Sequence, residues 1–321
     1  MRSQFGVNLS VARSCFVKCE GCYNHFGKSQ DLVTTDVIAR FLEIATEAGL
    51  RKVTFCGGDP LSRPDIMSLL EAARQLDLHI NLDTVGTPLL GTAGTIFYGR
   101  VEVPAVDCER LARLVDVIGV PVDGHDSASI ATFRVGRPLI FEEQMAIVGK
   151  LGKVGATICI NTVVHRSNHL NLCKTVPAVM SAGLIDHWQF FQFSPTGPLG
   201  HRNREKFQID DREFARFRGE MERALSDAGF CGKAEFKTNR AREGAYVLVD
   251  SEGWAWSPVS PRNDGQRADG SSQREVLGNI AEAGDFPRIM AAIIGRKSPR
   301  PSGSRPDLLT PLRDLGAPPQ G

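Results

Sequence analysis

Three cysteines lie within eight positions near the start of the chain, in the segment CFVKCEGC. Cys15, Cys19 and Cys22 have the spacing C-x3-C-x2-C. Three thiolates can ligate three irons of a four-iron, four-sulfur cube and leave the fourth iron without a protein ligand. The motif therefore predicts a [4Fe-4S] cluster with one iron open to a small molecule.

Two other uses of these thiols have to be weighed. His25 follows Cys22 at C-x2-H spacing, so the same segment can supply four ligands for a closed zinc site. A disulfide is disfavoured in a cytoplasmic protein, where thiols stay reduced. The polar N-terminus does not resemble a signal peptide, so we expect a cytoplasmic location.

Bulk composition excludes some classes of partner. The chain has 321 residues, which is enough for a full hydrophobic core, and its net charge is +1. This charge balance gives no electrostatic reason to expect a nucleic acid as partner. No apolar run is long enough to span a bilayer, so we expect no membrane partner either.

Short apolar segments alternate with helical patterns between residues 5 and 230. Serial βα units form a parallel sheet with helices on its outer side, and right-handed crossovers curl that sheet toward a barrel. Six units are two short of closure, so we predict an α/β fold with a partial (βα)6 TIM barrel. The candidate strands are 5–11, 52–56, 79–83, 116–122, 157–164 and 188–193.

The pattern changes after residue 230, which predicts three regions. Residues 1–230 would form the barrel. Residues 231–295 would form a small C-terminal cap, with short strands in AEFKT (234–238) and in YVLVDSEGWAW (246–256). Residues 262–275 are expected to form a flexible loop. Residues 296–321 are rich in Pro, Gly and Ser, and we expect a disordered tail there.

A glycine motif follows the second candidate strand. In parallel α/β folds, ligands bind at the carboxyl ends of the strands. In FCGGDP, Gly57 and Gly58 allow the backbone to approach a ligand closely, and Asp59 can accept hydrogen bonds from an ammonium group. The alternative is an ordinary tight turn, but the motif follows the cysteines by about one βα unit.

In this order, the cysteine and glycine motifs resemble the radical SAM superfamily. The resemblance implies that the cysteines bind the cluster and that Gly57, Gly58 and Asp59 bind S-adenosylmethionine (SAM). Asp59 stands where the family more often has Glu. It also implies that SAM is cleaved to a 5′-deoxyadenosyl radical, which takes a hydrogen atom from the substrate. The electron would come from a donor such as flavodoxin or ferredoxin.

Polar residues at the ends of the next strands extend the implied SAM site. Asp83 and Thr84 end the third strand, where the family commonly places a polar residue on SAM. Asp123 ends the fourth strand, and Asn161 points inward if the fifth strand alternates as predicted. The alternatives are a turn cap for Asp83 and a solvated loop for Asp123.

A closer resemblance is to the viperin-like radical SAM nucleotide dehydratases. It implies a nucleoside or nucleotide ligand and carries over Lys28, Arg137 and Tyr246 as substrate-side groups. The matching segments, in order, are EAGLRKVTFCGGDP, VGRP (135–138), INTVVHRSN, WQFFQF and YVLVDSEG.

The chain is also similar to the cytosylglucuronic acid decarboxylases of nucleoside antibiotic biosynthesis. Here Arg137 or Arg166 would hold the glucuronate carboxylate, although Arg166 could equally be an exposed surface residue. Our leading hypothesis is therefore a radical SAM lyase that decarboxylates this small-molecule substrate. The runner-up is a cytidine nucleotide dehydratase, and a third hypothesis is a zinc-stabilised binding protein without catalysis. For the runner-up, the candidate phosphate-binding cations are Lys28, Arg137, Arg166, Arg202 and Arg204.

The remaining cysteines are scattered. Cys56 and Cys159 lie within apolar strands, and we predict that they are core residues. No C-x2-C pair lies near the C-terminus, so we expect no auxiliary cluster of the kind found in peptide-modifying members of the family.

Overall fold

The computed structural model describes residues 6–23, 33–96, 102–242, 246–258 and 274–295. A ten-stranded sheet runs through it in the order β11-β10-β9-β7-β4-β3-β1-β12-β13-β14. Seven neighbouring strands, from β11 to β1, are mutually parallel. These are β1 (Gly6–Ala12), β3 (Lys52–Gly57), β4 (His79–Asp83), β7 (Val117–Pro121), β9 (Ile158–Val164), β10 (His187–Gln192) and β11 (Lys233–Lys237).

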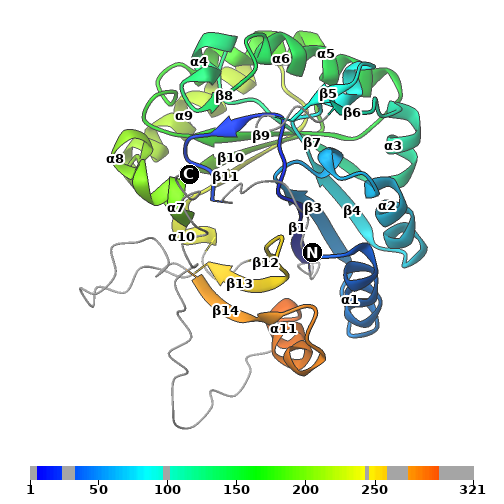
Figure 1. Cartoon of the computed structure of the whole chain (residues 1–321). Coiled ribbons are helices and arrows are strands. Elements are labelled where there is room, and N and C mark those ends of the chain that lie inside the picture. The colour runs from blue at the N-terminus through cyan, green and yellow to red at the C-terminus, as the bar shows by residue number, and fades with distance from the viewer. Residues whose placement is uncertain (1–5, 24–32, 97–101, 243–245, 259–273, 296–321) are drawn as a thin grey trace, which may run out of the picture.

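This sheet is an open barrel, as predicted. The six predicted strands correspond to β1, β3, β4, β7, β9 and β10, each within about a residue at either end. The sheet ends at β11 on one side and at β14 on the other, so it curves without closing (Figure 1).

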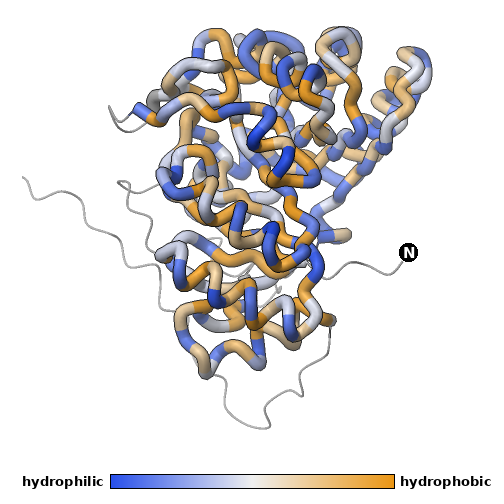
Figure 2. Tube along the Cα trace, turned by 90° about the vertical axis from the view of Figure 1, so that its right-hand side faces the viewer, coloured by the Kyte–Doolittle hydropathy of each residue, from blue (hydrophilic) through white to orange (hydrophobic). Residues whose placement is uncertain are grey.

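Helices cover the outer side of the barrel (Figure 1). Each helix buries one apolar face: α1 begins after its Thr34 cap, buries Phe41 and Leu42, and ends before Gly49. Hydrophobic and hydrophilic residues alternate along these helices (Figure 2). The outer helices are α1 (Thr35–Glu47), α2 (Ile66–Gln75), α3 (Cys108–Leu114), α5 (Ile140–Lys153), α6 (Val176–Ala182) and α9 (Asp211–Asp227).

Shorter elements lie between these units. Two small antiparallel pairs are β2 (Lys18–Cys19) with β8 (Arg134–Val135), and β5 (Gly94–Thr95) with β6 (Glu102–Val103). None of the helices in the described ranges combines the length and apolar character needed to cross a bilayer. The short helices are α4 (Ser127–Ala131), α7 (Gly197–Arg202), α8 (Arg204–Phe207), α10 (Asn239–Arg242) and α11 (Phe286–Ile293).

One strand expected in the cap lies in the barrel sheet instead. β11, which contains most of AEFKT, pairs in parallel with β10, and Phe236 stacks on Phe190 with the ring centroids 4.8 Å apart. The sheet therefore runs across the boundary at residue 230, and the division into domains there stays a prediction.

Three further strands continue the sheet on the far side of β1. β12 (Val247–Val249) pairs with β1 in parallel, and β13 (Trp254–Pro258) and β14 (Arg274–Asn279) follow antiparallel. Residues 250–253 join β12 to β13, and Gly253 has φ +88° there. The expected loop 262–275 lies outside the described residues except for its last two, which begin β14. The expected disordered tail 296–321 lies entirely outside them.

Candidate active site

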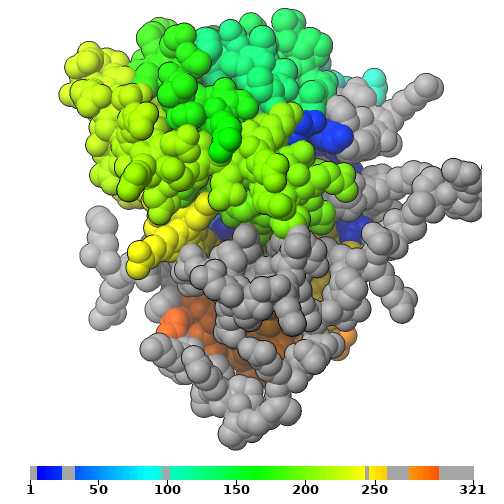
Figure 3. Space-filling view, turned by 90° about the vertical axis from the view of Figure 1, so that its left-hand side faces the viewer, coloured from blue at the N-terminus to red at the C-terminus, as the bar shows by residue number. Residues whose placement is uncertain are grey.

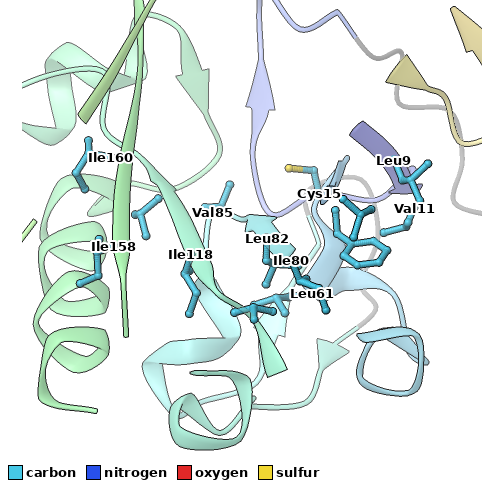
Figure 4. Close-up of a cluster of buried hydrophobic side chains, with 14 of the residues drawn as sticks. Leu9, Val11, Cys15, Leu61, Ile80, Leu82, Val85, Ile118, Ile158 and Ile160 are labelled. Carbon is cyan, nitrogen blue, oxygen red and sulfur yellow. The ribbon is translucent and has the colours of Figure 1, made fainter. Parts of the chain in front are cut away.

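The cysteine motif forms a loop at the carboxyl end of β1. Cys15 and Cys19 are buried, Cys22 is half-buried, and all three side chains are reduced thiols. The Cys22 N–H donates to the Cys19 carbonyl at 3.2 Å, which closes the turn between the last two cysteines. Cys15 adjoins the apolar cluster on the outer side of the sheet (Figure 4). The loop is thus built into the folded core.

Arg134 contacts the middle cysteine. Its Nη1 donates to the Cys19 thiol sulfur at 3.1 Å, and its Nε donates to the Asp123 carboxylate at 2.6 Å. Asp123 is fully buried, and its other oxygen accepts a hydrogen bond from the Val163 N–H. Although burial opposes the guanidinium charge, Asp123 and Cys19 raise the pKa of Arg134. Asp123 was predicted to bind SAM. In the structure its carboxylate binds Arg134, the residue whose guanidinium contacts Cys19 of the cysteine loop.

The thiols fit an iron–sulfur cube better than a closed mononuclear site. Burial raises the pKa of Cys15 and of Cys19 above the usual range, so the unligated thiols are protonated and release protons when they bind metal. Within the described ranges, no three metal-binding side chains converge as a single-ion site requires. A cube takes one cysteine at each of three separate irons, and the Arg134 N–H group provides a donor to one thiolate. His25 lies outside the described residues.

The glycine motif packs against the cysteine loop. The Gly58 N–H donates to the Ala12 carbonyl at 2.7 Å, and the Asp59 N–H donates to the Ser14 carbonyl at 2.6 Å. Gly57 has φ +130°, and a Cβ on Gly58 would overlap the backbone of Arg13 and Ser14. The close approach that these glycines allow is thus, first of all, between two loops of the protein.

Asp59 and Thr84 join the ends of two strands. The Asp59 carboxylate accepts hydrogen bonds from the Thr84 hydroxyl at 2.7 Å and from the Val85 and Leu61 N–H groups at 2.6 and 2.9 Å. Burial raises the pKa of Asp59 to about 6, against the opposite effect of these hydrogen bonds. Both side chains are almost fully buried, so their polar atoms are engaged by the protein itself.

The inner side of the barrel is polar. Asp83 accepts a hydrogen bond from Asn161 at 2.9 Å, and Lys237 donates to Gln189 at 2.7 Å. Burial lowers the pKa of Lys52, and the charge of Lys237 lowers it further, so the two ammonium groups lie within electrostatic reach of each other. Five strands, β3, β4, β9, β10 and β11, contribute these side chains.

Strand alternation explains why the two sides differ. In a strand, successive side chains point to opposite faces. Asp83 and Asn161 face the interior, whereas their neighbours Leu82 and Ile160 are fully buried in the outer apolar cluster (Figure 4). Cys159 shares the inner face, with its sulfur 3.5 Å from the Asn161 side-chain oxygen. Cys159 was predicted to be a core residue, and it is buried beside polar groups.

Tyr23 links the cysteine loop to this interior. Its hydroxyl lies 3.8 Å from the Cys56 sulfur, and its ring is close enough to Cys22 and Asp83 to interact with both electrostatically. Burial raises the pKa of Cys56 to about 12, which keeps this thiol protonated at neutral pH. The polar interior therefore begins directly beside the predicted cluster ligands.

The predicted substrate-side residues do not come together. Nε and Nη2 of Arg137 both donate to the Glu143 carboxylate, Nη2 at 2.7 Å. Arg166 is exposed and donates to the Gln208 carbonyl at 3.2 Å. Tyr246 is half-buried and enters β12 beside the start of β1, the sheet edge opposite the cysteine loop. Arg202 and Arg204 are exposed on α7 and α8, and Lys28 lies outside the described residues.

Sequence reasoning missed Arg134, Lys52, Gln189 and Lys237. The signal for the last three was the alternation of polar residues along apolar strands, as in Lys52-Val-Thr-Phe-Cys56. Arg134 gave no local signal, because its sulfur partner is 115 positions away.

A hollow of about 450 Å³ lies beside the barrel, near the start of α9. Figure 3 shows the face of the molecule on which α7, α8 and α9 form the yellow-green surface. Gln192 points away from the barrel interior, and its amide group is already bonded to Asp211 and Asn239. The hollow is therefore separate from the polar interior, and its lining residues are Gln192, Gln208, Ile209, Asp210, Asp211, Arg212 and Asn239.

Comparison with known proteins identifies a family and several relatives that this chain resembles. A family model described as "Radical SAM superfamily" matches residues 9–171. An AdoMet-dependent heme synthase of Methanosarcina barkeri is 25% identical over 257 residues, which is 78% of this chain and 66% of the relative. An S-adenosylmethionine-dependent nucleotide dehydratase of Lacinutrix mariniflava is 22% identical over 262 residues, which is 77% of this chain and 49% of the relative.

A solved structure has a similar fold. The SAM-bound SuiB of Streptococcus suis superposes with a TM-score of 0.66 at 15% identity, over 91% of this chain and 68% of that protein. Against the curated relatives the chain spans from about half to just under two thirds of their length. The likeness to SuiB shows the fold alone.

Proposed function

Because the chain belongs to the radical SAM superfamily, we propose that it modifies the sugar of a nucleoside, with decarboxylation of cytosylglucuronic acid as the leading reaction. Enzymes of this family use a [4Fe-4S] cluster and SAM. When bound, these cofactors supply a 5′-deoxyadenosyl radical that removes a hydrogen atom from the substrate. The protein's part is to hold the cofactors, orient the substrate and keep water away.

One observation carries this proposal: the cysteine loop lies beside a barrel interior lined with hydrogen-bonding side chains. Asp83, Asn161 and Gln189 offer acceptors and donors suited to hydroxyl groups of a sugar. Lys52 and Lys237 both act electrostatically on Asp83, so a substrate carboxylate beside it would bind to them. Lys52 begins β3 at the amino edge of the sheet, level with Gly6, and Lys237 also pairs with Glu235 at 3.4 Å. Arg137 and Arg166 suit this role less well, because Arg137 is held by two hydrogen bonds to Glu143 and Arg166 is exposed and bonded to the Gln208 carbonyl.

A second candidate function is a nucleotide dehydratase. The match to the Lacinutrix mariniflava relative supports it, since it covers 77% of this chain. Three substrate phosphates would need several cations. Lys52 and Lys237 supply two, and Arg202 and Arg204 are exposed on α7 and α8.

Anaerobic incubation with SAM and dithionite tests the proposal. We expect 5′-deoxyadenosine to form, and cytosylglucuronate to raise its yield and release carbon dioxide, whereas CTP does neither. Cys19→Ala removes a predicted cluster ligand and should abolish both products. Cys231→Ala, which changes an exposed cysteine outside the loop, should leave them unchanged.

Two results would contradict the proposal in different ways. Turnover of CTP without turnover of cytosylglucuronate would establish the dehydratase instead. Tightly held zinc, without iron or sulfide after anaerobic purification and reconstitution, would exclude radical chemistry altogether.

A further inference from the structure

Arg134 lies opposite Cys19, the middle cysteine of the loop. In the antiparallel pair of β2 and β8, Cys19 is the register partner of Arg134, and the neighbouring Glu20 N–H donates to the Phe133 carbonyl at 2.8 Å. This pairing thus fixes the position of the Arg134 backbone relative to Cys19. The Nη1 hydrogen bond to the sulfur, at 3.1 Å, follows from that register.

Asp123 fixes the position of the Arg134 guanidinium group. Its carboxylate is fully buried and accepts from Arg134 Nε at 2.6 Å and from the Val163 N–H at 2.7 Å. The Asn168 amide donates to the Asp123 carbonyl at 2.9 Å and so holds the same residue from the other side. The guanidinium is therefore preorganised before any cofactor binds.

We propose that Arg134, oriented by Asp123, is a positioning residue that donates a hydrogen bond to the Cys19 thiolate and raises the reduction potential of the cluster. Reduction adds one negative charge to a cluster that thiolates already make negative. A partly buried positive charge and an N–H donor at one thiolate stabilise the reduced state more than the oxidised state. Outer-shell partners of this kind also hold ligands in place.

Arg137 provides a matched comparison three positions away. It is partly buried and paired with a carboxylate, like Arg134, but its partner is Glu143 and no bond from it to a sulfur is found among the described residues. If a partly buried arginine–carboxylate pair had only a structural role, that role would be the same for Arg134 and Arg137. Only Arg134 has an additional bond to a cluster ligand.

The test measures the midpoint potential of the reconstituted cluster by anaerobic titration followed by electron paramagnetic resonance. In Arg134→Gln, we expect the ratio of reduced to oxidised cluster at a fixed potential to fall about tenfold, which is about 59 mV for one electron. Arg134→Lys keeps the charge but lacks the two separate nitrogens, Nε and Nη1, with which arginine reaches Asp123 and Cys19, so we expect a smaller fall. Arg137→Gln should stay within about twofold of the unmodified protein.

The inference rests on the three cysteines holding the cluster, and iron and sulfide analysis checks that premise separately. A fully loaded Arg134→Gln protein whose potential equals that of the unmodified protein would overturn the role of Arg134. Should this variant fail to load, Arg134→Met, which also removes both the charge and the donor, is measured instead: an unchanged potential overturns the proposal, and a lower one supports it. A missing cluster in the unmodified protein would instead count against the proposed function.

Discussion

His165 is a titratable side chain enclosed by aromatic rings. It is fully buried, stacks on Phe133 with the centroids 4.8 Å apart, and meets the edge of Phe207 at 5.2 Å. Its Nδ1 accepts a hydrogen bond from the Ser167 N–H at 3.2 Å. Burial, followed by the charge of Arg134, lowers the pKa of His165 to about 3. The folded protein therefore keeps this imidazole neutral at pH values where the unfolded chain protonates it.

This difference predicts a loss of stability in acid. An unfolded histidine takes up its proton below about pH 6.5, but the folded His165 does so only near pH 3, so its contribution is present above pH 6.5 and is lost as pH falls between these values. The free energy of unfolding should fall by roughly 1 kcal/mol per pH unit from this group alone. Urea unfolding of the cluster-free protein at several pH values measures the slope.

His165→Phe is the variant that isolates the effect. A phenyl ring fits the aromatic surroundings and cannot titrate. Between pH 6.5 and 4, the slope of the unfolding free energy against pH should therefore decrease by the contribution of about one bound proton. His201→Ala, in the short helix α7, serves as the control and should leave the slope unchanged. An unaltered slope in His165→Phe would show that this imidazole is protonated in the folded state as well.

The contact between two loops decides whether the cysteines are presented correctly. The segment after β3 is hydrogen-bonded to the segment after β1 through Gly58 and Asp59. A Cβ on Gly58 would come within 2.7 Å of the Arg13 carbonyl group and closer still to the Ser14 oxygen, and both are backbone atoms that cannot turn away. Gly58→Ala must therefore displace the loop that carries Cys15.

For Gly58→Ala we expect less iron and sulfide per chain after anaerobic reconstitution, and a loss of about 1–3 kcal/mol in the free energy of unfolding. Gly152→Ala is the matched control. A Cβ at Gly152 meets no atom within 4 Å, and the residue lies inside α5, where alanine is the better helix former. That control should load normally and gain up to about 1 kcal/mol. Normal loading of Gly58→Ala would show that the contact is dispensable.

Elements were predictable where one side of them is apolar. In KVTFC, Val53 and Phe55 face the outer helices and are fully buried, so the strand could be recognised from composition alone. In β11, only Ala234 and Phe236 face outward, and the interior side carries Lys233, Glu235 and Lys237. Such a strand has little hydrophobic signal, which is why it was assigned to a cap.

The candidate site was predictable where its chemistry is local in sequence. The three cysteines lie in one short loop, and their spacing predicts a ligand set without any information from distant segments. Asp59 and Asp123 were expected to face a ligand, but each carboxylate is turned toward protein donors by hydrogen bonds from distant segments. Spacing in the sequence holds no information about those partners. The direction of a side chain at a strand end is set by the tertiary fold.

Continuity of the sheet makes a prediction about the molecule as a folding unit. Ten strands are joined by hydrogen bonds from β11 to β14, without a break between the barrel and the C-terminal strands. Apolar burial is continuous as well, since Val7 and Leu9 of β1 share one core with Val247 and Val249 of β12. We expect the described residues to unfold in a single cooperative transition.

The three tryptophans allow this to be tested from both ends of the sheet. Trp188 is buried in β10, next to the β11 edge, and Trp256 is buried in β13, next to the β14 edge, while Trp254 is more exposed. In the double variant Trp254→Phe/Trp256→Phe, all tryptophan fluorescence comes from Trp188. In Trp188→Phe, it comes from the two tryptophans of the C-terminal strands. In each variant, urea unfolding followed by fluorescence should coincide with unfolding followed by far-ultraviolet circular dichroism.

Trp188→Phe will be the less stable variant, because it loses the hydrogen bond from Nε1 to the Thr162 hydroxyl at 3.0 Å along with part of the core volume. Its midpoint should therefore shift, but for both probes together. If fluorescence from Trp256 were lost at a lower urea concentration than the circular dichroism signal, the C-terminal strands would be a separate unit. The C-terminal strands would then be an energetically distinct part of the chain that begins after β11, not at residue 230, even though one sheet runs across that boundary.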